Sequence, residues 1–140
     1  MVMDAQKTIL VVEDNLDSRE LLVHILKRNG FGVAEATTGI EAVDQARAVL
    51  PDLILMDLGL PGITGDEATA RLKADPRTKD IPIVVNTAYH SGSPLVTRAM
   101  AVGAAEVLYK PINFSGIQEI VGRYFVTRPD NANSLIRQDP

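Results

Sequence analysis

The chain has 140 residues, 46% of them hydrophobic and 23% charged, which is the length and balance of one folded globular domain and excludes disorder throughout. Lys and Arg number 14 against 18 Asp and Glu, and the net charge of -4 argues against nucleic acid or an anionic membrane as the partner. The chain lacks cysteine and any apolar run near the roughly 18 residues that span a bilayer, which predicts a cytoplasmic protein that is not in a membrane.

Short apolar runs rich in β-branched residues alternate with segments of helical spacing. The first run, 8–12, precedes a helix in which Leu22, Ile25 and Leu26 fall on one face and which Asn29-Gly30 ends. The other strands are expected at 32–36, 53–56, 83–87 and 106–110, and the other helices at 39–49, 64–74, 94–102 and 114–126.

Strict alternation of strand and helix predicts parallel strands joined by right-handed helical crossovers, which is a doubly wound α/β fold. The run at 53–56 is apolar throughout, as a strand covered by helices on both faces requires. The stretch 127–140 combines prolines, asparagines and aspartates with little apolar content, so it is expected to be a mobile C-terminal tail. We therefore expect one domain over residues 1–126 and no output domain.

Charged and polar residues stand at the carboxyl ends of the expected strands, where open α/β sheets bind ligands. They are Glu13 and Asp14 after the first strand, Asp57 after the third, Thr87 at the end of the fourth and Lys110 at the end of the fifth. If the first and third strands are neighbours, three carboxylates converge, and each pair at about 6 Å repels by roughly 3 kcal/mol at an effective dielectric of about 20. A nearby cation must offset this repulsion.

The chemistry of these side chains indicates which cation and which reaction fit. Hard carboxylate oxygens without histidine or cysteine nearby suit Mg²⁺. A carboxylate beside a metal ion, a lysine and a hydroxyl group is also the set that can take a phosphoryl group. Asp57 is the expected nucleophile.

These residues resemble the motifs of a two-component response-regulator receiver domain. The resemblance is carried by Glu13-Asp14, by Asp57 with Pro61 and Gly65 after it, by Thr87-Ala88 and by Lys110-Pro111. It spans about residues 7–126 and implies a flavodoxin-like sheet of five parallel strands in the order 2-1-3-4-5. It also implies a stand-alone signalling switch of a two-component system or phosphorelay, which acts through contact with a downstream protein target.

The resemblance implies a role for each residue that handles the phosphoryl group. Asp57 would accept it from a phosphohistidine on a sensor histidine kinase or a histidine phosphotransfer protein, and Thr87 and Lys110 would contact its oxygens. The chain would catalyse this transfer and a slow autodephosphorylation without being a conventional enzyme. The Lys110-Pro111 peptide is expected to be cis, which only a bond before proline permits at low cost.

A metal site is implied in the same way. Asp14, Asp57 and the backbone carbonyl of Gly59 would bind Mg²⁺, with Glu13 acting through a water molecule. The acids argue against a flavin-binding electron carrier of the same architecture, because a flavin phosphate needs a cradle of hydroxyl groups and glycine after the first strand. Gly59 also stands where a phosphatase of the dehalogenase type has its second aspartate. A degenerate receiver that only docks, without phosphorylation, is the third alternative.

One position departs from the family pattern. Receivers usually carry tyrosine or phenylalanine three residues before the lysine, and this chain has Val107 there. Because strand side chains alternate, Tyr109 shares the face of Val107, while Lys110 points the other way. Tyr109 is therefore one ring that could report phosphorylation, and Tyr89 is a second ring that could shield the phosphoryl group from water. Alternatively, Val107 only packs, and the signal passes through the backbone after the fourth strand.

Overall fold

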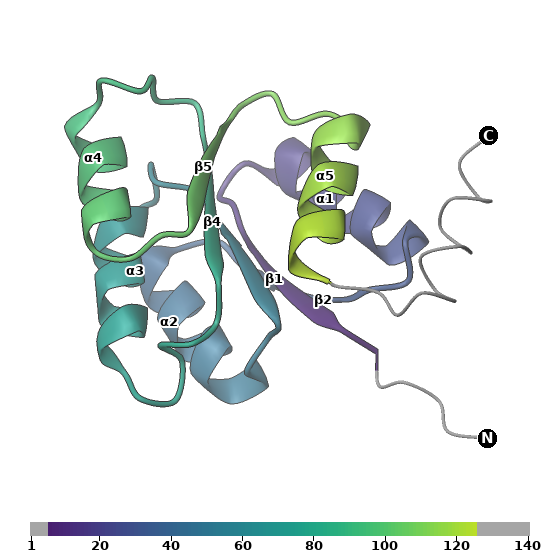
Figure 1. Cartoon of the computed structure of the whole chain (residues 1–140), viewed down its shortest axis with the longest axis horizontal. Helices are drawn as coiled ribbons and strands as arrows, with labels where there is room; N and C mark the ends of the chain where they lie inside the picture. Colours follow the sequence, from purple (N-terminus) through teal and green to yellow (C-terminus); the bar gives the residue numbers. More distant parts are fainter. Residues whose placement is uncertain (1–5, 126–140) are drawn as a thin grey trace.

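The computed structural model describes residues 6–125, and its strands and helices alternate as predicted (Figure 1). The strands are β1 (Thr8–Val12), β2 (Gly32–Ala36), β3 (Leu53–Met56), β4 (Ile83–Thr87) and β5 (Glu106–Tyr109). The helices are α1 (Leu16–Arg28), α2 (Gly39–Val49), α3 (Gly65–Ala74), α4 (Pro94–Ala101) and α5 (Phe114–Tyr124). The tail expected at 127–140 lies outside the described residues.

The strands form one parallel sheet in the order β2-β1-β3-β4-β5, which confirms the expected doubly wound fold. β1 and β3 are neighbours, with Val12 opposite Met56, so the residues that follow them start from the same edge. β4 and β5 end together in the same way, with Thr87 opposite Tyr109. The topology thus brings the carboxyl ends of these strands to one edge of the sheet.

Helices cover both faces of this sheet: α1 and α5 lie on one face, and α2, α3 and α4 lie on the other (Figure 1). All of β3 is buried, because Leu53 and Leu55 pack on the α1 and α5 side while Ile54 and Met56 pack on the α2 and α3 side. This division explains the unbroken apolar run. Within residues 6–125 no helix has the length and apolar character needed to cross a membrane.

Several element ends differ from the expected ones by one or two residues. Thr64 is the N-cap of α3 and Lys110 follows β5, so neither residue belongs to the element expected for it. The fifth helix ends at Tyr124 because Phe125 leaves the helical conformation, and its ring lies 4.8 Å from that of Phe31, measured between centroids. These shifts leave the predicted topology unchanged.

Candidate functional site

Three carboxylates lie together at the carboxyl edge of the sheet, where the sequence places them. One oxygen each of Glu13, Asp14 and Asp57 lies within 4.8 Å of the others. Glu13 is 2% exposed and Asp57 is 7% exposed, whereas Asp14 faces solvent. The backbone N–H of Asn15 donates to Oε2 of Glu13 at 3.1 Å and fixes one side of the cluster. The result is a compact set of oxygen ligands that is open to solvent at Asp14.

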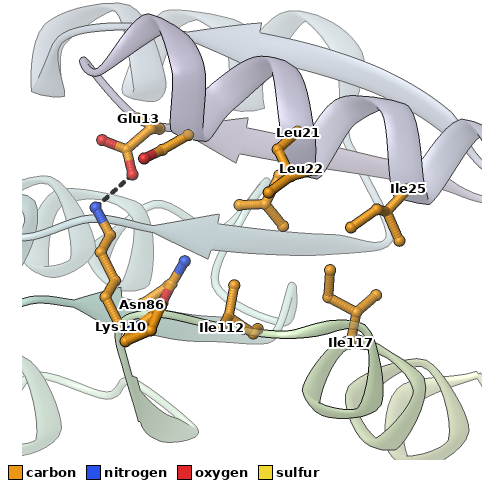
Figure 2. A pocket seen from close by; sticks show the side chains of 10 residues that line it. Glu13, Leu21, Leu22, Ile25, Asn86, Lys110, Ile112 and Ile117 are labelled. Atoms are coloured by element: carbon orange, nitrogen blue, oxygen red, sulfur yellow. Dashed lines mark hydrogen bonds and ion pairs between the residues drawn. The ribbon is translucent and has the colours of Figure 1, made fainter.

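Lys110 supplies a positive charge to this cluster. Its Nζ donates a hydrogen bond to Oε1 of Glu13 (Figure 2). The same Nζ lies 3.2 Å from Oδ2 of Asp57. The backbone N–H of Lys110 donates to the carbonyl of Thr87 at 2.8 Å, and the Lys110-Pro111 peptide is cis, as expected. Burial opposes the charged form, but the hydrogen bond with Glu13 and the charge of Asp57 raise the pKa of Lys110 overall. Lys110 is therefore a cation at neutral pH.

The cluster carries more negative charge than Lys110 balances. Burial raises the pKa of Glu13, the charge of Asp57 acts in the same direction, and the hydrogen bonds from Lys110 and Asn15 oppose the rise. One ammonium contacts two of the three carboxylates. A set of carboxylate oxygens with excess negative charge fits a hard divalent cation such as Mg²⁺. The oxygen ligands of Glu13, Asp14 and Asp57 are thus of the type that binds Mg²⁺.

The backbone that follows Asp57 is held by hydrogen bonds and by close packing against the start of α3. Oδ1 of Asp57 accepts hydrogen bonds from the N–H groups of Leu58 at 2.7 Å and Gly59 at 3.4 Å. The start of α3 packs against the same segment, and the N–H of Gly65 donates to the carbonyl of Leu58 at 2.9 Å. A Cβ on Gly65 would lie 1.9 Å from the carbonyl oxygen of Asp57, so only glycine allows this approach.

Thr87 ends β4, the strand next to β3, and Tyr89 follows it in the loop toward α4. Thr87 is fully buried at the end of β4, and its Oγ1 accepts a hydrogen bond from the N–H of Tyr89 at 3.0 Å. A hydroxyl that accepts this bond keeps its own proton for another acceptor. The ring of Tyr89 covers Gly59, because a Cβ on Gly59 would lie 3.3 Å from both Cε2 and Oη of the tyrosine. Tyr89 nevertheless remains 42% exposed.

The residues of β5 alternate as predicted. Val107 packs against the buried cluster that includes Val96 and Ala99 of α4, whereas Leu108 packs on the α1 and α5 side. Tyr109 is 46% exposed beside the end of β4. This placement leaves the reporting roles of Tyr109 and Tyr89 as predictions.

A groove beside the carboxylates was not predicted from the sequence. It has a volume of about 360 Å³ and lies between α1 and the segment that runs from Lys110 into α5 (Figure 2). Its apolar lining is Leu21, Leu22, Ile25, Ile112 and Ile117. Asn86 also lines it, is 4% exposed, and has an Oδ1 with no hydrogen-bond partner among the described residues. Asn86 lies two residues after Val84 on β4 and therefore shares its face, so its place under α1 and α5 could have been found from the period of two.

Known proteins resemble this chain over most of its length. Residues 9–122 match the family model of the response regulator receiver domain. The chain is 39% identical over 107 residues to the phosphate regulon transcriptional regulatory protein PhoB of Escherichia coli strain K12, which covers 76% of this chain and 46% of PhoB. It is 33% identical over 118 residues to the polar-differentiation response regulator DivK of Brucella ovis, which covers 84% of this chain and 95% of DivK. The chain thus spans about half the length of PhoB and almost all of DivK.

Solved structures give the same result. The receiver domain of the sensor histidine kinase PA1611 of Pseudomonas aeruginosa PAO1, with a magnesium ion in its active-site cleft, matches with a TM-score of 0.80 and 30% identity over 88% of this chain and 100% of that one. The chemotaxis protein CheY4 of Vibrio cholerae matches with a TM-score of 0.78 and 30% identity over 86% of this chain and 100% of that one. The flavin carrier and the phosphatase are not favoured by these matches. The chain belongs to the response regulator receiver domain family of two-component signalling.

Proposed function

We propose that the chain is a phosphorylation-controlled switch in which Asp57 accepts a phosphoryl group from a phosphohistidine. The observation that carries this proposal is the buried carboxylate of Asp57, with the ammonium of Lys110 at 3.2 Å and two further carboxylates beside it. A carboxylate oxygen of Asp57 forms a bond to phosphorus, the bond between phosphorus and the imidazole nitrogen breaks, and the imidazole keeps the electron pair. The product is an acyl phosphate on Asp57.

The neighbouring side chains are proposed to stabilise the charge that moves during this transfer. Lys110, already at Asp57, and the hydroxyl of Thr87 would contact the phosphoryl oxygens. Asp14, Asp57 and the carbonyl of Gly59 would hold Mg²⁺, with Glu13 acting through water. When bound, Mg²⁺ would neutralise negative charge on the phosphoryl oxygens. The chain would thus catalyse its own phosphorylation and its slow autodephosphorylation.

The proposed phosphodonor is a sensor histidine kinase or a histidine phosphotransfer protein. The groove next to Glu13 and Lys110 supports a protein donor, because its walls are apolar and Leu21 at its rim is 57% exposed. A partner seated there would bring its histidine beside Asp57. A downstream protein target and a cytoplasmic location stay predictions.

Mass spectrometry of the intact protein tests the proposal. After incubation with a small phosphoramidate and Mg²⁺, the wild type should gain one phosphoryl group, and a chelator should prevent the gain. The gain should vanish in Asp57→Ala and persist in the control Asp44→Ala, which removes an exposed carboxylate from α2. Full labelling of Asp57→Ala would overturn the assignment. A docking module that is not phosphorylated would show no added mass in any variant.

A further inference from the structure

α3 and α4 lie on the face of the sheet away from the groove (Figure 1). A forked ion pair joins the two helices. Nη1 of Arg98 on α4 lies 2.9 Å from Oδ2 of Asp66, and Nη2 lies 3.0 Å from Oε1 of Glu67. Both acids stand in the first turn of α3. The side chain of Asp66 is only 2% exposed, and its Oδ1 is buried with no hydrogen-bond partner among the described residues. Such a carboxylate depends strongly on its single cation.

The α3 end of this pair is fixed to the phosphoryl acceptor. Asp66 directly follows Gly65, whose Cα packs against the carbonyl of Asp57 with no room for a Cβ. The N–H of Gly65 is bonded to the carbonyl of Leu58 at 2.9 Å. The backbone at the start of α3, from which the Asp66 side chain extends, is therefore packed directly against Asp57.

The α4 end of the pair is connected to Thr87. The loop of residues 88–93 leads from Thr87 to α4, and the N–H of Tyr89 in this loop is bonded to the Thr87 hydroxyl oxygen at 3.0 Å. α4 has eight residues, of which only Val96 and Ala99 are buried. Apolar packing of α4 rests on Val96, Ala99 and the partly buried Leu95, and the ion pair of Arg98 adds a polar link from α4 to α3.

We propose that Arg98 and Asp66 are positioning residues whose ion pair holds α4 against α3 and opposes its displacement when Asp57 is phosphorylated. The inference rests on the proposed function for its trigger. When the Thr87 hydroxyl donates to a phosphoryl oxygen, the loop bonded to it moves with it and pulls on α4. Because α3 is fixed at Gly65, this pull stretches the contact between Arg98 and Asp66.

Separation of Arg98 from Asp66 would leave a buried carboxylate without its cation and with one oxygen already unpartnered, so the contact resists displacement of α4. It yields only if phosphorylation supplies stronger interactions elsewhere. New charge-assisted hydrogen bonds at the phosphoryl group are the proposed source of that free energy. Glu67 keeps a second partner when Arg98 leaves, because Nε of Arg71 lies 3.2 Å from its other oxygen.

Hydrogen exchange of the α4 amides tests the unphosphorylated state. Arg98→Met should accelerate this exchange about tenfold, because the buried Asp66 loses its cation. The matched control is Arg71→Met, which removes the other guanidinium from Glu67 but breaks a contact within α3 alone. The control should leave α4 exchange within about twofold of the wild type. Equal acceleration in both variants would overturn the proposal.

The change in α4 amide exchange on phosphorylation is a second measurement, which a purely structural role of Arg98 would not alter. In the wild type, labelling with a small phosphoramidate should accelerate α4 exchange, and in Arg98→Met the same labelling should change it less, because α4 is already released. An equal phosphorylation effect in both proteins contradicts the proposal. Should Arg98→Met not fold, Arg98→Lys is the second variant, because it keeps the positive charge but cannot contact Asp66 and Glu67 with two separate nitrogens. Its α4 amides should exchange faster than those of the wild type and more slowly than expected for Arg98→Met. Exchange at the wild-type rate would contradict the role of the pair. If the wild type is not labelled on Asp57, the proposed function fails, while the unphosphorylated comparison still tests the ion pair.

Discussion

If Asp57 accepts a phosphoryl group as proposed, we expect Tyr89 to control how long that group survives. The ring of Tyr89 covers Gly59, which follows Asp57 by two residues. A side chain at residue 59 would displace the tyrosine ring. In Tyr89→Ala, water would reach the acyl phosphate more easily, and we expect its lifetime to shorten by about two- to tenfold, since a tenfold change corresponds to about 1.4 kcal/mol in the barrier. The measurement is the decay of the phosphorylated mass after the phosphodonor is removed.

Two controls separate shielding by the ring from other effects. Tyr89→Phe keeps the ring and should keep the lifetime. Tyr109→Ala removes a ring of similar exposure from the neighbouring strand and should leave the lifetime unchanged. An unchanged lifetime in Tyr89→Ala would show that water already reaches Asp57 past the ring, and a shortened lifetime in Tyr109→Ala would assign the shield to the wrong tyrosine.

At the level of elements, Asp75 ties the end of α3 to α2. Its Oδ2 lies 2.8 Å from Nε of Arg47 and 3.0 Å from Nη2 of Arg77, and its Oδ1 accepts the backbone N–H of Arg77 at 2.9 Å. These hydrogen bonds, those from Arg77 first, hold the pKa of Asp75 well below its usual range. The folded pKa is thus lower than the unfolded one of about 3.9. Asp75 therefore contributes stability above about pH 4, and this stability is lost as the pH falls toward the folded pKa.

Urea unfolding at two pH values checks this contribution. Asp75→Asn should unfold at lower urea than the wild type at pH 7, and the difference should shrink at pH 3, where the wild-type carboxylate begins to lose its advantage. Asp44→Asn, an exposed position on α2, serves as the control and should differ little from the wild type at pH 7. A difference for Asp75→Asn that is as large at pH 3 as at pH 7 would contradict the linkage.

The elements themselves were predictable because their periodicities are local. The apolar run 53–56 indicated a strand buried on both faces, and the structure buries all of it. The tie between α3 and α4 was not predictable in this way. Asp66 reads as an ordinary acid in the first turn of a helix, and Arg98 lies 32 residues further along the chain. Only the packing of α4 on α3 buries that carboxylate and selects its partner.

For the whole molecule, the sheet order creates the site. Glu13 and Lys110 are 97 residues apart in sequence and bonded in space. Glu13 was predicted from its place after a strand and Lys110 from its place at the end of one, while the family resemblance supplied the order that makes β1 and β3 neighbours. The groove at Asn86 was missed because it depends on how α1 and α5 pack together. A site built from distant segments exists only in the folded chain, so a ligand that binds it stabilises the entire fold.

Magnesium should therefore raise the thermal stability of the protein. Three clustered carboxylates repel one another, and Lys110 contacts only two of them. Mg²⁺ that binds the folded state alone adds RT ln(1 + [L]/Kd), about 1.4 kcal/mol at roughly ten times Kd, which corresponds to a Tm increase of a few degrees. Melting curves with and without millimolar Mg²⁺ measure this gain.

Asp14→Ala is the discriminating variant for this prediction. Asp14 is the exposed member of the cluster, so its removal should leave the buried packing intact. Without metal, this variant should be at least as stable as the wild type, because one source of repulsion is gone. With Mg²⁺ it should gain less than the wild type, because one ligand oxygen group is gone. Equal gains in the two proteins would place the magnesium site elsewhere, and a large loss of stability without metal would mean that Asp14 supports the fold instead of straining it.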